Sequence, residues 1–144
     1  MTAENVQELL EGAGVPDEFD LLSLDVDRNT YWIWAALRRY HPRAVVVEYN
    51  AAYPPEQEWV VPYAAQEIWD GSLNFGASLK AYEKLAAELG YCLVGCELAG
   101  VNAFFVRQDL CGAELFRAPY TAENHYEPPR YFLAQRGGAR RPAH

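Results

Sequence analysis

The feature that most constrains the fold is an apolar run without polar alternation, RAVVVEYN, over residues 43–50. β-Branched residues favour strands, and a strand without alternation is typical of one that is covered on both faces. A second run of strand length, DLLSLDVD, occupies residues 20–27, and helical spacing of apolar residues predicts a helix over residues 31–40 between the two runs. Strands separated by helices pair in parallel through right-handed crossovers. The sequence therefore predicts an α/β fold.

The rest of the chain extends this sheet. Apolar residues at helical spacing predict a helix over residues 77–89, which Gly90 ends. Two further runs, 91–97 and 102–107, are predicted to form a hairpin that adds one antiparallel strand. We expect about four strands, three parallel and one antiparallel, with flanking helices. The domain prediction is an α/β domain over residues 1–110 and an irregular C-terminal extension over residues 111–144.

The charge balance excludes some classes of partner. The chain of 144 residues has 20 acidic and 12 basic residues, a net charge of -8, whereas a nucleic-acid surface needs clustered Lys and Arg. No segment approaches the ~20 apolar residues of a membrane span, and the first residues are too polar for a secretory signal. Cys92 and Cys96 lie four residues apart in one strand-like run, about 13 Å at ~3.3 Å per residue, which is too far for a disulfide, and no CxxC pattern or nearby His makes them a zinc pair. We therefore expect no nucleic-acid or membrane partner, reduced thiols and a cytoplasmic location.

Acidic and amide side chains follow the two predicted parallel strands, where open α/β sheets bind ligands. Asp25 and Asp27 lie two residues apart and would share a face if the strand continues, as would Glu48 and Asn50 on the next strand. These oxygen-bearing side chains form a candidate Mg²⁺ site, with Asp25, Asp27 and Glu48 also as catalytic candidates. Two alternatives remain open: the residues cap helices or pair with nearby arginines, or one carboxylate acts as a base without a metal.

Residues 51–75 form a long aromatic connection, and connections of that length are uncommon unless they are functional. Tyr53 and Trp69 are candidate substrate-binding residues, although the aromatic residues of this segment could equally form a small core beneath the loop. The remaining substrate-binding candidates are Asn29, Tyr49 and Asn50, and His125 is a candidate general base. No nucleophile motif, dinucleotide-binding motif or phosphate-binding loop is present.

Three ordered blocks carry a family resemblance: DLLSLDVDRNTYWIWAAL, RAVVVEYNAAYPP and NFGASLKAYEKLAAELGYCLVGCELAGVNAFFVR. Together they resemble the C-terminal half of FkbM-type methyltransferases, which depend on S-adenosylmethionine (SAM). The resemblance covers about residues 2–110. It implies that residues 20–27 and 43–50 are the fourth and fifth strands of a seven-stranded class I methyltransferase sheet, and that the hairpin supplies the sixth and seventh.

The resemblance also places the SAM motif on a first strand and a ribose-binding acid on a second strand, and this sequence contains neither. Their absence argues against SAM binding by the chain alone. The sequence departs from the relatives at Arg28, where they tend to have a glycine, so the loop geometry is expected to differ.

The resemblance implies a methyltransferase-like biosynthetic enzyme of secondary metabolism that acts on a small polar metabolite, with SAM-independent chemistry as one option. The alternative is a non-catalytic pseudo-methyltransferase or a split-enzyme subunit that works through a partner chain. Without the first three strands, the strand at residues 20–27 lies at an open sheet edge, and such edges invite pairing. We therefore expect a homodimer or a partner chain at that edge.

Overall fold

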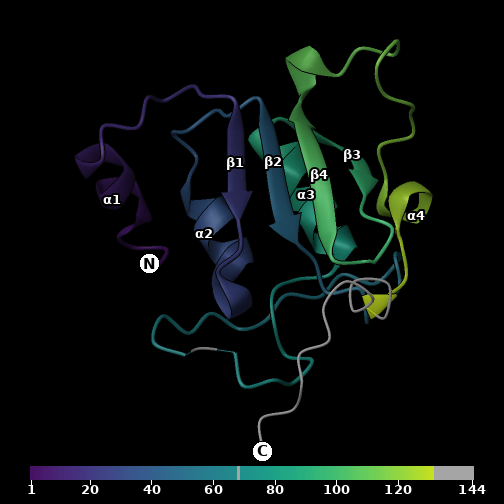
Figure 1. Ribbon diagram of the computed structural model, residues 1–144, viewed down its shortest axis with the longest axis horizontal. Coiled ribbons are helices and arrows are strands. Elements are labelled where there is room, and N and C mark those ends of the chain that lie inside the picture. The colour runs from purple at the N-terminus through teal and green to yellow at the C-terminus, as the bar shows by residue number, and fades with distance from the viewer. Residues whose placement is uncertain (68, 132–144) are drawn as a thin grey trace, which may run out of the picture.

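A four-stranded sheet organises the computed structural model, which describes residues 1–67 and 69–131 (Figure 1). In chain order the main elements are α1 (Val6–Gly12), β1 (Leu21–Leu24), α2 (Thr30–Ala36), β2 (Ala44–Glu48), α3 (Leu79–Leu89), β3 (Tyr91–Cys96), β4 (Asn102–Arg107) and α4 (Ala122–His125). Short 3-10 helices follow β1 at Asp27–Asn29 and β4 at Gln108–Leu110. The predicted α/β class, with about four strands and flanking helices, is confirmed.

The strand order is β1-β2-β4-β3. β1 and β2 are parallel, whereas β4 is antiparallel to both β2 and β3. Only β1 and β2 pair in parallel, so the predicted set of three parallel strands does not form: β3 runs in the same direction as β1 and β2, but β4 lies between β2 and β3 and pairs antiparallel with both. The reason is the hairpin: the chain returns from β3 through β4, and β4 takes the place beside β2. Phe105 of β4 then lies opposite Val45, and both are fully buried.

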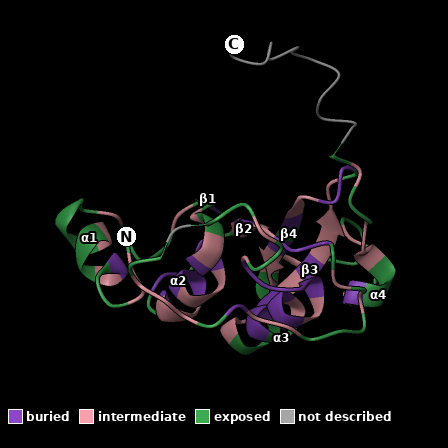
Figure 2. Ribbon diagram, turned by 90° about the horizontal axis from the view of Figure 1, so that it is seen from below, coloured by how far each residue is buried: buried purple, intermediate pink, exposed green. Residues whose placement is uncertain are grey.

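Helices α2 and α3 lie on the same side of the sheet (Figure 1), and the buried residues gather between these helices and the strands (Figure 2). Trp34 of α2 packs edge-on against Phe105 with 4.9 Å between the ring centroids. Tyr82 of α3 is also fully buried in this layer. A core of this kind is stabilised mainly by removing apolar surface from water.

The opposite side of the sheet is less covered. Along β2, Val45 and Val47 are buried, whereas the alternate residues, including Val46, are half-buried. On the same side, Leu21 of β1 is 56% exposed and Phe104 of β4 is 39% exposed. The prediction that β2 is covered on both faces is therefore wrong. Valine is compatible with either face of a strand, so the run of β-branched residues did not distinguish a buried face from a half-open one.

Two capping interactions fix the ends of α3. The Ser78 hydroxyl accepts a hydrogen bond from the Ala81 amide at the start of the helix, and Gly90 ends it at a φ of 84°. The same hydroxyl accepts a hydrogen bond from the Trp59 amide at 3.0 Å. The cap of α3 thus also anchors the long connection that precedes it.

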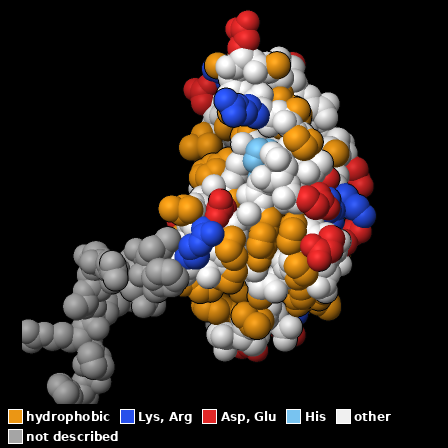
Figure 3. Space-filling view, turned by 90° about the vertical axis from the view of Figure 1, so that its right-hand side faces the viewer, with side chains coloured by type: hydrophobic (Ala, Val, Ile, Leu, Met, Phe, Trp, Pro, Cys, Tyr) orange, Lys and Arg blue, Asp and Glu red, His pale blue; other side chains and the backbone are white. Residues whose placement is uncertain are grey.

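The C-terminal segment packs back onto this framework through residues 122–130. The amide of Ala122 donates to the Glu83 carboxylate of α3, and Lys80 bridges Glu83 and Glu123. On the side of the molecule that carries β3 and α4, hydrophobic side chains gather in one region with charged side chains around them (Figure 3). The domain division at residue 110 stays a prediction, and residues 132–144 of the predicted extension lie outside the described residues. Within the described ranges, no helix has the length and apolar character needed to cross a membrane.

Candidate functional site

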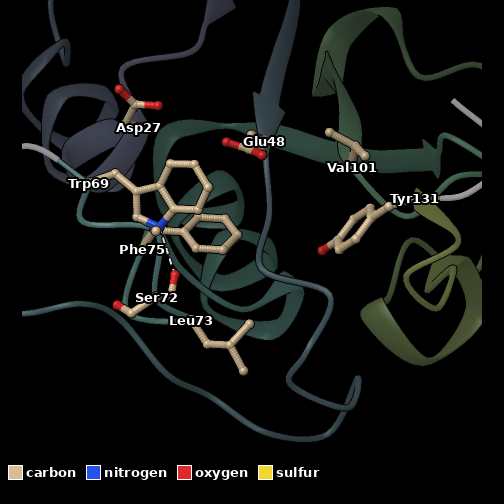
Figure 4. Close-up of a pocket in the computed structure, with 9 residues that line it drawn as sticks. Asp27, Glu48, Trp69, Ser72, Leu73, Phe75, Val101 and Tyr131 are labelled. Carbon is tan, nitrogen blue, oxygen red and sulfur yellow. Dashed lines mark hydrogen bonds between the residues drawn. The ribbon is translucent and has the colours of Figure 1, made fainter. Parts of the chain in front are cut away.

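A cavity of about 400 Å³ lies beyond the ends of β1 and β2 (Figure 4). Four segments form its wall: the link after β1, the end of β2, the loop before α3, and the β3–β4 turn with the C-terminal segment. The lining residues are Asp27, Glu48, Trp69, Gly71, Ser72, Leu73, Phe75, Val101 and Tyr131. The site expected at the carboxyl ends of the two parallel strands thus coincides with a real hollow.

The link after β1 turns sharply, and this turn separates the two aspartates. β1 ends at Leu24, and the chain enters a 3-10 helix at Asp27, which has a φ of 49°. Aspartate tolerates this left-handed conformation better than most residues. Asp25 and Asp27 therefore do not share a strand face, contrary to the expectation for a continuing strand. Only Asp27 lines the cavity, while Asp25 and Asn29 border a neighbouring depression that Asp27 also borders.

Glu48 is the last residue of β2, and its half-buried side chain projects into the cavity (Figure 4). Burial raises the pKa of its carboxyl group to about 7, and the negative charges of Asp25 and Asp27 add to this effect. Burial and like charges both disfavour the ionised form of a carboxyl group. Glu48 can consequently exchange a proton near neutral pH.

Asn50 is fully buried and holds the loop over the cavity. Its amide nitrogen donates to the carbonyl oxygens of Leu73 at 2.7 Å and Phe75 at 3.1 Å, and its carbonyl oxygen accepts from the Ala52 amide at 3.2 Å. This network occupies both ends of the side-chain amide. Asn50 therefore positions the loop and does not line the cavity, and its expected role as a metal ligand or substrate-binding residue stays a prediction.

Two side chains from the first half of the chain hold the same loop. The Arg28 guanidinium donates to the carbonyl oxygens of Pro62 and Asn74, both at 3.2 Å, and pairs with Glu67. The indole of Trp32 donates to the Val61 carbonyl oxygen at 2.8 Å. Arg28, the departure from the family pattern, thus takes a structural role here.

The aromatic residues of the long connection divide between two roles. Trp69 and Phe75 line the cavity with their rings edge-to-face and 5.8 Å between centroids, and the Trp69 indole donates to the Ser72 carbonyl oxygen at 2.6 Å. Tyr53 instead stacks on Trp59 at 4.4 Å, outside the cavity lining. Trp69 and Phe75 therefore lie where the segment was expected to line a ligand site, whereas Tyr53 and Trp59 form a separate half-buried pair, and the binding role stays a prediction.

The far wall consists of residues that sequence reasoning missed. Val101 follows the β3–β4 turn, and Tyr131 follows residues 127–130, which lie against this turn; both side chains are labelled in Figure 4. The amide of Arg130 donates to the Ala99 carbonyl oxygen at 2.8 Å, which holds the segment in place. Nothing in the local sequence around Tyr131 indicates this contact, because it depends on chain segments about thirty residues apart.

Two other predicted residues do not reach the cavity. Tyr49 is buried and its hydroxyl donates to the Glu127 carbonyl oxygen at 2.6 Å, so its polar group is already satisfied. His125 lies in α4, where its ring nitrogen contacts the Asn124 amide at 3.4 Å. Of the candidate residues, the structure brings Asp27, Glu48 and Trp69 together at the cavity.

The described residues provide only part of a binding site for Mg²⁺ or for SAM. Among the described residues, no group of three or more His, Cys, Asp or Glu side chains is arranged to hold a metal ion. The predicted Mg²⁺ set also loses Asn50 to the loop network. For SAM, none of the described residues forms the glycine-rich loop that the resemblance assigns to the cofactor. We therefore derive no step through Mg²⁺ or SAM.

Comparison with known proteins adds no further assignment. No family model matches the chain, and no curated protein or solved structure matches it either.

Proposed function

We propose that this chain is a methyltransferase-like biosynthetic enzyme that acts on a small polar metabolite in the cavity at the ends of β1 and β2. The observation that carries the proposal is the position of Glu48, a carboxyl group with a pKa of about 7 in the wall of a cavity of about 400 Å³. Cavities of this size suit small molecules, and a general base is most effective when its pKa lies near the operating pH.

The proposed chemistry is proton transfer by Glu48. The ionised carboxylate accepts a proton from an acidic position of the substrate and returns it to the product or to water. Asp27 lies in the same wall, and its charge keeps the Glu48 proton affinity high. The rings of Trp69 and Phe75 form an apolar side of the cavity. This route uses no SAM, which agrees with the absent cofactor motif.

Substrate consumption tests this proposal directly. The purified chain is incubated with a polar metabolite extract at pH 8, with and without added SAM, and mass spectrometry follows every component. We expect one metabolite to be consumed by the wild type and the rate to fall at least ~100-fold in Glu48→Gln. Glu114→Gln, at an exposed position outside the cavity, is the matched control and should retain the full rate.

Equal consumption by the wild type and Glu48→Gln would remove Glu48 from the mechanism. No consumption of any component would contradict an autonomous enzyme and favour the alternative function. Consumption only when SAM is present would show that the chain binds SAM despite the absent motif.

The alternative function is that of a pseudo-methyltransferase or split-enzyme subunit that works through a second chain. β1 supports it, because this strand pairs only with β2 among the described residues and Leu21 on it is largely exposed. An edge strand of this kind presents unpaired backbone groups to a neighbour. A homodimer through β1 would appear in light scattering at high micromolar concentration and would dissociate in Leu21→Lys. A wild-type monomer under these conditions contradicts the homodimer.

The proposed location is the cytoplasm. Cys92, Cys96 and Cys111 are all free thiols, as is usual in a reducing compartment.

A further inference from the structure

The cavity lining combines carboxylates with aromatic rings, and we propose that it binds an organic cation: an amine or a methylated ammonium group on the substrate. This inference rests on the proposed function, because it concerns the same cavity, and it specifies that the ligand is positively charged.

Negative charge dominates the cavity wall. Asp27 and Glu48 both line it, and no Lys, Arg or His from the described residues does. The neighbouring Arg28 points its guanidinium at the carbonyl oxygens of the loop and at Glu67, so its charge is already paired. An anionic ligand would meet repulsion here without a compensating donor of positive charge. A cation would relieve the repulsion between the carboxylates themselves.

Aromatic rings supply the second half of the recognition. Trp69, Phe75 and Tyr131 line the same cavity, and Figure 4 shows the Trp69 and Phe75 rings below the two carboxylates, with Tyr131 across from them. The faces of aromatic rings carry partial negative charge and attract cations, tryptophan most strongly. The Trp69 ring is held in place by its hydrogen bond to the Ser72 carbonyl oxygen. A cation in the cavity would thus lie between carboxylates and rings.

Cation binding would also prepare Glu48 for proton transfer, because a nearby positive charge favours its ionised form. The titratable groups near Glu48 are Asp25 and Asp27 from the link after β1, Tyr82 from α3, and Tyr131. Burial raises the pKa of both phenols, so they stay neutral near pH 7. Affinity for a permanent cation should therefore increase as the pH rises through about 7, where Glu48 ionises.

The test uses two probes of the same shape and different charge. Choline carries a trimethylammonium group, and 3,3-dimethylbutan-1-ol has a neutral tert-butyl group in its place. Binding to the full chain is measured by NMR titration at pH 6 and pH 8. We expect choline to bind at least tenfold more tightly than the alcohol at pH 8, and the ratio to shrink at pH 6. Equal affinities, or no binding of choline up to 50 mM, would overturn the inference if found both in the wild type and in the variant without the three C-terminal arginines described below.

Variants separate the two contributions. Glu48→Gln and Asp27→Asn should each weaken choline binding several-fold and leave the alcohol unaffected. Trp69→Leu keeps apolar contact but removes the indole ring, and we expect about a fivefold loss for choline alone. Trp59→Leu removes an indole outside the cavity lining and is the matched control. If Trp59→Leu weakens choline binding as much as Trp69→Leu, the effect is not local to the cavity and the inference fails.

The chain carries basic residues of its own in the C-terminal sequence, at Arg136, Arg140 and Arg141. The titrations are therefore repeated with these three residues changed to glutamine, so that an internal cation cannot mask the preference. If the preference for choline is absent in this background as well, the inference is overturned.

The two proposals fail separately. Choline preference without any turnover that depends on Glu48 would support a cation site and contradict the proposed enzyme. Turnover of a neutral or anionic metabolite that depends on Glu48, without choline preference, would contradict the cation site and support the enzyme.

Discussion

Gly100 in the β3–β4 turn fixes the far wall of the cavity, and replacing it with alanine should destabilise the protein strongly. Gly100 has a φ of 72°, and a Cβ atom there would lie 2.5 Å from the Pro128 carbonyl oxygen and 2.8 Å from that of Glu127. Since ordinary contacts begin near 3.4 Å, the segment that leads to Tyr131 would have to retreat by about 0.9 Å (3.4 minus 2.5). Backbone atoms cannot yield as a flexible side chain can.

The magnitude follows from three contributions. The left-handed conformation costs alanine roughly 1–2 kcal/mol, partly offset by about 0.4–1 kcal/mol from the reduced freedom of the unfolded chain. Displacing packed atoms adds roughly 1–3 kcal/mol. The Arg130 amide bond to Ala99 also lies in the displaced segment, and losing it costs about 1 kcal/mol. We expect Gly100→Ala to lower the free energy of unfolding by about 4 kcal/mol, or Tm by roughly 8–16 °C.

Gly14→Ala is the matched control for backbone strain. Gly14 has a φ of 70°, and nothing lies within 4 Å of a Cβ atom built on it. This variant should therefore lose only about 0.5–1 kcal/mol, the difference between the strain and the unfolded-state gain. Urea unfolding followed by circular dichroism measures both variants. A difference of less than 0.5 kcal/mol between Gly100→Ala and Gly14→Ala would refute the close approach of residues 127–128 to the turn.

Three further predictions concern the cavity and its support. The folded protein retains the Glu48 proton after the unfolded chain has lost it, so wild-type stability should fall as the pH rises from 4.5 to about 7. Glu48→Gln should remove about 1 kcal/mol of this fall, a value reduced for solvent screening, and urea unfolding at each pH measures it. Tyr82→Phe removes a buried hydroxyl without a hydrogen-bond partner among the described residues, so Tm should stay constant or rise slightly. Asn50→Ala should lower stability by about 1–3 kcal/mol and accelerate amide exchange in residues 71–76.

Each of these predictions has a contrary result. A wild-type stability profile that Glu48→Gln leaves unchanged between pH 4.5 and 7 would show an ordinary carboxyl pKa. A loss of more than about 1.5 kcal/mol in Tyr82→Phe would show that the hydroxyl makes a bond. For the loop, Asn124→Ala at an exposed position is the control, and equal exchange in the two asparagine variants would contradict the anchoring by Asn50.

The strands and the larger helices could be predicted because their signals are local, whereas the short helix α4 lies in a segment that was predicted to be irregular. The β-branched run at β2 predicts a strand, the apolar stripe before Gly90 predicts α3, and the two runs after it predict the hairpin. The position of the cavity could be predicted from a general property of α/β sheets, in which the ends of adjacent parallel strands lie together. Asp27 and Glu48 were found in this way.

The strand order and the identity of the far wall were decided by tertiary packing. Whether β3 or β4 lies beside β2 depends on which strand buries its side chains best against Val45, and no local pattern encodes this choice. The orientation of the Asn50 side chain depends on its hydrogen bonds to the carbonyl oxygens of Leu73 and Phe75. Tyr131 lies at the cavity because residues 127–130 pack against the turn at Gly100. Local periodicity thus determined the elements and the edge of the sheet where chemistry is placed. Long-range packing and hydrogen bonding decided which side chains meet there, because those energies depend on contacts between segments far apart in the chain.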